Sequence, residues 1–169
     1  MANILILRNA HPNASDIKTV YSEDQVVENG YVVALGEVST EREHRNAFKA
    51  ETPAADKIHV MIYNADVPVI TDENGNTYKG IVSDPRNIKF VAGTNVNAYM
   101  PSVGEEIAMT EIAGEKSSNE YVVYKASDMK PTYAADKSDA LIAYKITGEK
   151  FVSIGNERVA TVELICVKA

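Results

Sequence analysis

The chain is organised as short apolar runs separated by Gly, Asn, Asp and Pro. The runs are four to nine residues long, which suits a strand and is short for a helix. Pro68 places the third of them at the edge of a sheet, because proline cannot donate a backbone hydrogen bond. Strands are predicted for residues 4–7, 58–63, 67–71, 88–91, 96–100, 104–110, 120–125, 139–147 and 159–165.

Two Asn-Gly pairs lie between apolar residues and predict hairpin turns, since both residues readily take the positive φ that a two-residue turn requires. Asn29-Gly30 is the centre of a predicted hairpin over residues 25–36. Asn74-Gly75 follows Asp72 in a spacing that resembles a calcium loop. The glycine and glutamate that such a loop needs at its sixth and twelfth positions are missing, so the hairpin turn is favoured.

Composition supports strands throughout. The chain has 169 residues, with 19 Val, 14 Ile and 10 Thr against 5 Leu, and branched side chains pack well on a pleated surface. We therefore expect a mainly β protein, built as one or two small antiparallel β-barrels or sandwiches with long loops and little helix. Residues 1–100 are predicted to form an N-terminal β domain with extended loops, and residues 101–169 a small C-terminal β-barrel docked on it.

The charge balance argues against nucleic acid as a partner. The formal net charge is −7, whereas binding to phosphate backbones depends largely on Lys and Arg. The start of the chain lacks the basic residues and the longer apolar core of a signal peptide, and no run approaches a membrane span. From these features we expect a protein that is neither secreted by the general pathway nor inserted into a membrane.

The strands carry almost no polar residue that could belong to a catalytic site. His59 is the exception, and we interpret it as a surface or hydrogen-bonded structural residue. Cys166 lies in an apolar run and is expected to be a buried, inert thiol. Glu105 and Glu106 point to opposite faces of a strand and cannot act as a facing pair. We expect no enzymatic activity, no metal site and no cofactor.

Three segments, in this order, resemble a family of phage proteins. They are Gly30-Tyr31-Val32-Val33-Ala34-Leu35-Gly36, then Glu41-Arg42-Glu43 with Thr52-Pro53-Ala54, and then Gly104-Glu105-Glu106-Ile107-Ala108-Met109-Thr110. The order is similar to that of small structural proteins encoded beside the major capsid protein of tailed phages and prophages of Gram-positive bacteria. In the third segment Glu105 stands where that family has aspartate, and Ile107 where it has an aromatic residue.

The resemblance implies a virion protein, a decoration or cement protein on the phage head. Its partners would be the major capsid protein and, as a homo-oligomer, further copies of the chain. It would reach the head surface after synthesis in the host cytoplasm. Such a protein binds a repetitive surface through many shallow contacts, and therefore needs a rigid scaffold with presenting loops more than it needs a pocket.

The polar segment of residues 40–56 is the candidate for that contact. Arg42 and Arg45 suit bidentate contacts with carboxylates, with Glu43 between them. Phe48 would be an apolar anchor, and Pro53 would limit the entropy lost on docking. The alternative for this segment is that it packs back onto its own barrel.

Two other classes of function stay open at this stage. A β-barrel module that binds carbohydrate or another small ligand, cytoplasmic or tail-associated, would need exposed aromatic rings. The candidates are Tyr121, Tyr124, Tyr133 and Tyr144, although core positions suit them as well and the chain has no Trp. A cytoplasmic protein acting on a small molecule would need a large pocket with convergent polar groups.

Overall fold

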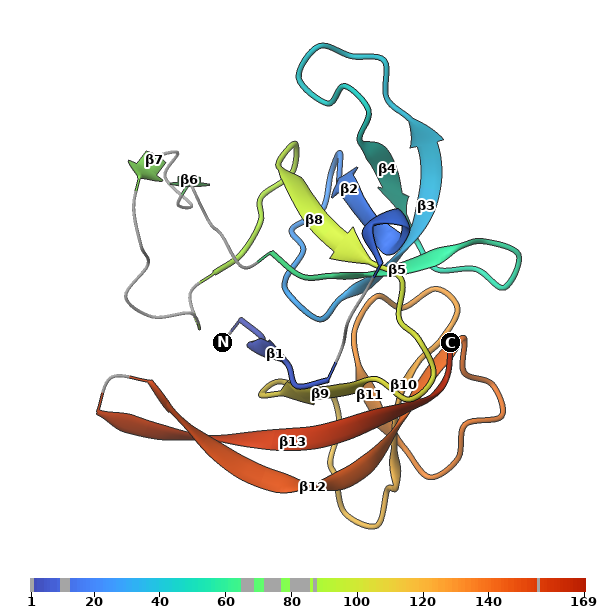
Figure 1. Ribbon diagram of the computed structural model, residues 1–169, viewed down its shortest axis with the longest axis vertical. Coiled ribbons are helices and arrows are strands. Elements are labelled where there is room, and N and C mark those ends of the chain that lie inside the picture. Colours follow the sequence, from blue (N-terminus) through green and yellow to red (C-terminus); the bar gives the residue numbers. More distant parts are fainter. Residues whose placement is uncertain are drawn as a thin grey trace.

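The computed structural model describes residues 2–9, 13–64, 69–71, 77–79, 86, 88–154 and 156–169, and it confirms the mainly β fold. Its elements form a closed five-stranded barrel, a six-stranded sheet and a separate strand pair (Figure 1). A 3-10 turn, η1 (Ala14–Asp16), precedes the first barrel strand. Among the described residues, no helix is long and apolar enough to cross a membrane.

The barrel comes from the N-terminal half of the chain. Its strands are, in spatial order, β2 (Ile17–Tyr21), β4 (Phe48–Glu51), β3 (Val32–Val38), β5 (His59–Ile62) and β8 (Asn95–Tyr99). All neighbours are antiparallel except β2 and β4, which pair in parallel. The expectation of antiparallel barrels therefore holds for four of the five contacts around this barrel.

The sheet comes mainly from the C-terminal half. Its strands are, in spatial order, β1 (Leu5–Leu7), β9 (Glu106–Met109), β13 (Glu157–Lys168), β12 (Ile142–Ile154), β10 (Tyr121–Tyr124) and β11 (Thr132–Ala134). All of its pairs are antiparallel. This corrects the expectation of a closed barrel at 101–169: the edge strands β1 and β11 do not meet, and the sheet stays open.

The predicted boundary near residue 100 lies in the connection between the barrel and the sheet. Strand β1 lies on the N-terminal side of this boundary but belongs to the C-terminal sheet, because Leu5 to Leu7 pair with β9. Strands β6 (Val69–Thr71) and β7 (Thr77–Lys79) pair with each other. The turn predicted at Asn74-Gly75 lies outside the described residues.

The hairpin predicted over residues 25–36 does not form. Gly30 has the expected positive φ of 82°, but Val27 pairs with Phe90 rather than with β3. The turn is bound instead to a distant segment, because the Asn29 side-chain oxygen accepts from the backbone N–H of Asn64 at 2.8 Å. The local signal identified the turn correctly, and long-range hydrogen bonds decided which strands it joins.

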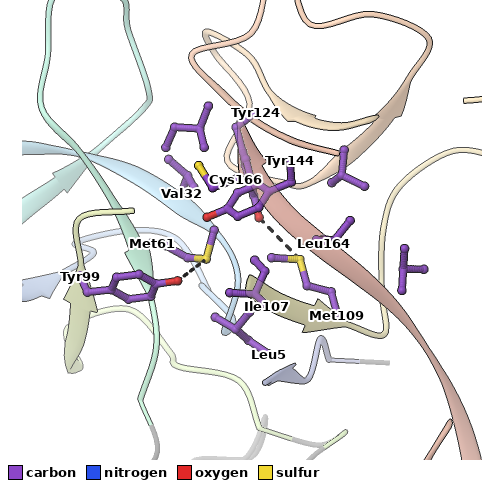
Figure 2. Packing of buried hydrophobic residues seen from close by; sticks show 13 residues of the cluster. Leu5, Val32, Met61, Tyr99, Ile107, Met109, Tyr124, Tyr144, Leu164 and Cys166 are labelled. Carbon is purple, nitrogen blue, oxygen red and sulfur yellow. Dashed lines mark hydrogen bonds between the residues drawn. The ribbon is translucent and has the colours of Figure 1, made fainter. Parts of the chain in front are cut away.

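One face of the sheet covers one side of the barrel. The barrel strands on this side are buried on both faces, which explains why their sequences are continuously apolar. On β3, Val33 points into the barrel core, whereas its neighbour Val32 packs in the cluster shared with the sheet. Val32, Met61 and Tyr99 lie side by side on three adjacent barrel strands and contact this shared core. Figure 2 shows them opposite Ile107, Met109, Tyr124, Tyr144 and Leu164 of the sheet. Both faces of these barrel strands are therefore buried.

A buried carboxyl group lies where the barrel and the sheet meet. Glu105, in the connection between β8 and β9, is 6% exposed. Its Oε1 accepts hydrogen bonds from the hydroxyls of Tyr99 on the barrel, at 3.3 Å, and Tyr144 on the sheet. Its Oε2 accepts from the backbone N–H of Ser102 at 3.3 Å. Burial raises the pKa of this carboxyl group, although the hydrogen bonds oppose the rise.

Candidate functional site

The loop between β3 and β4 is the strongest candidate for a contact surface, and we call residues 39–47 the arginine loop. It lies at the end of the molecule opposite the six-stranded sheet (Figure 1). Its side chains are mostly exposed, and it contains turns but no helix. The structure has an exposed loop here, which passes into β4 at Phe48.

Backbone hydrogen bonds hold the base of the arginine loop closed. Ser39 N–H donates to the Ala47 carbonyl at 2.8 Å, and Asn46 N–H donates to the Ser39 carbonyl at 3.2 Å. Asn46 reaches this position with a φ of 64°, a conformation that asparagine tolerates better than most residues. A further turn is closed by Ala47 N–H donating to the His44 carbonyl at 2.9 Å. The loop therefore has a defined backbone shape.

His44 fastens the middle of the loop to the barrel. Its ring stacks on that of Tyr21, with centroids 4.1 Å apart and planes 1° from parallel. Asn95 Nδ2 donates to the Glu43 carbonyl at 3.0 Å, which leaves Asn95 Oδ1 to accept from His44 Nδ1 at 2.8 Å. These contacts come from β2 and β8, on the barrel wall. The loop is thus ordered before any partner binds, which reduces the entropy lost on docking.

Arg42 and Arg45 are exposed and line one concavity of about 450 Å³ together with Val38 and Asn46. Within the described part of the chain, neither guanidinium has an ion-pair or hydrogen-bond partner. Glu41 and Glu43 lie beside them in the sequence and are also exposed without an ion pair there. A guanidinium offers five donors in a planar fork. The site can therefore bind carboxylates or another planar anion.

The structure places the other predicted contact residues differently. Phe48 is half-buried on β4 and packs against the barrel core. Pro53 is buried, and its carbonyl accepts from the backbone N–H of Ser127 at 2.9 Å. Both residues contact the barrel and support the loop from inside, and their role as contact residues stays a prediction. Glu43 stays at the surface, where its carbonyl is bound by Asn95.

Val38 is an exposed apolar side chain beside the two arginines, and no pattern in the sequence indicated it. It is the last residue of β3, is 48% exposed and borders the two arginines. The register of β3 against β4 shifts between Leu35 and Val38, and Val38 is exposed beyond this irregularity.

The tyrosines proposed for ligand stacking do not form an exposed platform. Tyr124 and Tyr144 are fully buried, and their rings contact edge to face at 6.4 Å. Tyr121 and Tyr133 are half-buried and pack against core clusters of the sheet. All four lie in core positions, which was the alternative interpretation of these tyrosines in the sequence.

A polar concavity of about 490 Å³ contains another tyrosine, Tyr31, with Glu28, Asp128 and Lys130. Burial, with the charges of Glu28 and Asp128 in addition, raises the pKa of Tyr31 to about 12, so its phenol is neutral at pH 7. The Lys130 ammonium lies 5.9 Å from the ring centroid. One face of this ring is therefore already occupied by a cation.

The remaining candidate groups have structural surroundings. His59 Nε2 lies 2.9 Å from the Ala54 carbonyl, as expected for a hydrogen-bonded structural histidine. Cys166 is buried, and burial raises the pKa of its thiol to about 11. Glu105 is buried and Glu106 is exposed, so the two side chains differ in their surroundings. In the described residues, no three His, Cys, Asp or Glu side chains are grouped closely enough to hold a metal ion.

No family model, curated protein or solved structure matches the chain.

Proposed function

We propose that the chain is a capsid decoration or cement protein, which binds the head surface of a tailed phage through the arginine loop. The observation that carries this proposal is a preordered loop with two exposed guanidiniums that have no partner among the described residues, on a chain whose net charge is −7. The order of the sequence segments that resemble capsid-associated phage proteins supports it. The partner surface on the major capsid protein would be rich in Asp and Glu.

The role is one of binding rather than catalysis, and the fold suits it. The loop extends from a barrel whose interior is filled by Val20, Val33, Val60 and other apolar side chains. The barrel is braced on one side by the sheet. A scaffold of this kind keeps a loop in one geometry over many identical contacts, so that weak individual contacts add up on a repetitive surface.

The test is binding of purified chain to phage heads that lack it, measured by co-sedimentation at several salt concentrations. Replacing Arg42 and Arg45 together by alanine is expected to weaken binding at least about thirtyfold, because each guanidinium would leave a carboxylate unpaired. Binding of the wild type is expected to weaken as salt rises, since exposed charges are screened.

The matched control is Lys125→Ala with Lys145→Ala, which removes the same two charges from exposed positions on the sheet. This variant should bind as the wild type does. Equal weakening by both pairs would show an effect of net charge alone and would contradict a site at the arginine loop. A folded arginine variant that co-sediments normally would remove the proposal.

A further inference from the structure

Strands β12 and β13 continue beyond the sheet as a two-stranded arm, which we define as residues 146–154 and 157–161. β12 pairs with β10 only over Ile142 to Lys145, and β13 pairs with β9 only over Val162 to Ile165. Beyond these positions the two strands pair with each other alone. Figure 1 shows the ribbon projecting from the body of the sheet. A pair of strands without further neighbours is only marginally stable in water, so contacts on the faces of the arm add to its stability.

The two faces of the arm differ in what covers them. On the inner face, Val152, Ile154 and Val159 are half-buried, and Arg86 holds Glu157 at 2.5 Å on this side. On the outer face, Phe151 is paired with Ala160, and Ser153 with Arg158. All four of these side chains are exposed. The inner face therefore already has contacts within the chain, and the outer face is open.

Phe151 and Arg158 form the main feature of the outer face. Phe151 is 60% exposed, and the Arg158 guanidinium lies 4.9 Å from the centroid of its ring. Arg158 has no carboxylate partner among the described residues. Aromatic residues and arginine are enriched among the side chains that dominate binding energy at protein interfaces. Together the two side chains offer an apolar ring and a positive charge that one binding site on a partner could contact.

The other end of the same ribbon lines an open surface concavity, which we call the Asp139 cavity and whose chemistry complements that of Phe151 and Arg158. It has a volume of about 650 Å³ and is lined by apolar residues that include Ile58, Met100, Pro101 and Leu141. Ile58 is 59% exposed. This volume is several times that of a phenylalanine side chain, so the cavity has room for the ring of Phe151.

One carboxylate in that cavity lacks a partner. Asp139 is exposed and makes no ion pair or side-chain hydrogen bond with any described residue. The two lysines of the lining are already engaged, since Lys57 binds Glu51 and Lys168 donates to the Ala140 carbonyl. Asp139 is thus the charged side chain that remains available for a guanidinium.

The arm cannot fill the cavity of its own chain. The cavity includes Ile142, at the base of β12, and Phe151 lies nine residues further along the same strand. At about 3.3 Å per residue the separation is roughly 30 Å. We therefore infer that Phe151 and Arg158 dock into the Asp139 cavity of a second copy of this chain. Such a contact joins two different surfaces, so that repetition gives a ring or an open chain of copies.

Sedimentation velocity over a range of protein concentrations tests the inference without any capsid. The wild type is expected to form dimers and larger species as concentration rises. Phe151→Ser and Asp139→Arg should each weaken association at least about thirtyfold. Combining Arg158→Asp with Asp139→Arg reverses both charges and should restore part of the association that Asp139→Arg removes. Val26→Ser, at a 51% exposed position of the barrel half, is the control and should associate normally.

Mixing distinguishes this contact from a symmetric one. A Phe151→Ser chain still has an intact cavity, and an Asp139→Arg chain still has an intact arm, so their mixture should give dimers and nothing larger. A wild type that stays monomeric at every concentration would overturn the inference, as would normal association of either single variant. Failure of the mixture to form dimers would also count against it.

Discussion

Replacing Gly30 by alanine is expected to lower the free energy of unfolding by about 2–5 kcal/mol. Gly30 has a φ of 82°, and an L-residue in this left-handed region costs about 1–2 kcal/mol. A Cβ here would also lie 2.4 Å from Asn3 Nδ2, and overpacking of this kind costs about 1–3 kcal/mol.

Asn3 cannot readily move away from the new methyl group. It is 2% exposed, and its Oδ1 accepts from the backbone N–H groups of Thr110 and Glu111 at 3.2 and 3.0 Å. Gly30 is held from the other side, because its carbonyl accepts from the Tyr124 hydroxyl at 2.7 Å. The substitution therefore strains a point where the N-terminal segment, the barrel and the sheet meet.

Urea denaturation would measure the loss, and Gly93→Ala is the matched control. Gly93 has a similar φ of 78°, but a Cβ there would meet nothing within 4 Å. It should show only the backbone cost of about 1–2 kcal/mol. Equal losses for the two variants would mean that the contact with Asn3 contributes nothing.

Replacing Glu105 by alanine is the second change with a large expected effect, about 2–5 kcal/mol of unfolding free energy. It leaves the buried hydroxyls of Tyr99 and Tyr144 and the backbone N–H of Ser102 without their acceptor. Each unsatisfied buried group costs about 1–3 kcal/mol, and the loss of the costly buried carboxyl group offsets part of the sum. Glu106→Ala, on the exposed face of β9, should stay within about 0.5 kcal/mol of the wild type.

Glu105 should also make stability depend on pH in a direction opposite to that of a typical carboxyl group. Burial raises its pKa in the folded protein above the ordinary value of 4.5, so the folded state binds this proton more tightly than the unfolded state does. The stability that the neutral group contributes is present below pH 4.5 and is lost as pH rises through the raised pKa.

Glu105→Gln isolates this effect, because glutamine stays neutral at every pH and all other carboxyl groups titrate alike in both proteins. Thermal unfolding of the two proteins between pH 4 and 8 should show the difference in stability shifting steadily in favour of glutamine as pH rises. A constant difference across this range would show that Glu105 titrates normally.

Most of the predicted strands form, although residues 88–91 contribute only the isolated bridge between Phe90 and Val27. The strand predictions that succeeded and the pairing predictions that failed have different physical causes. The strands at residues 58–63 and 120–125 are local: branched and aromatic side chains bounded by turn residues favour extended backbone whatever lies beside them. Which strands pair is not local. Leu5 to Leu7 lie in the N-terminal part yet pair with β9, about a hundred residues further along the chain.

The candidate contact site was predictable only in part, because some of its features are local and others depend on contacts between distant segments. Arg42 and Arg45 lie in a run too polar to be buried, so their exposure followed from the sequence. Phe48 lies only three residues beyond Arg45, and its inward direction depended on the pairing of β4 with both β2 and β3. The anchoring of His44 on Tyr21 joins side chains far apart in the sequence, and no local pattern indicates it.

The amino-acid sequence by itself determined a β protein with a core of branched side chains, a polar segment at residues 40–56 and a negative net charge, because these properties depend on composition and on neighbouring residues. Tertiary structure alone decided that the barrel closes in the N-terminal half and that Glu105 is buried between two tyrosines. It also decided that β12 and β13 project with Phe151 and Arg158 exposed. Each of these depends on contacts between distant segments, whose free energy belongs to the assembled fold rather than to any one stretch of the chain.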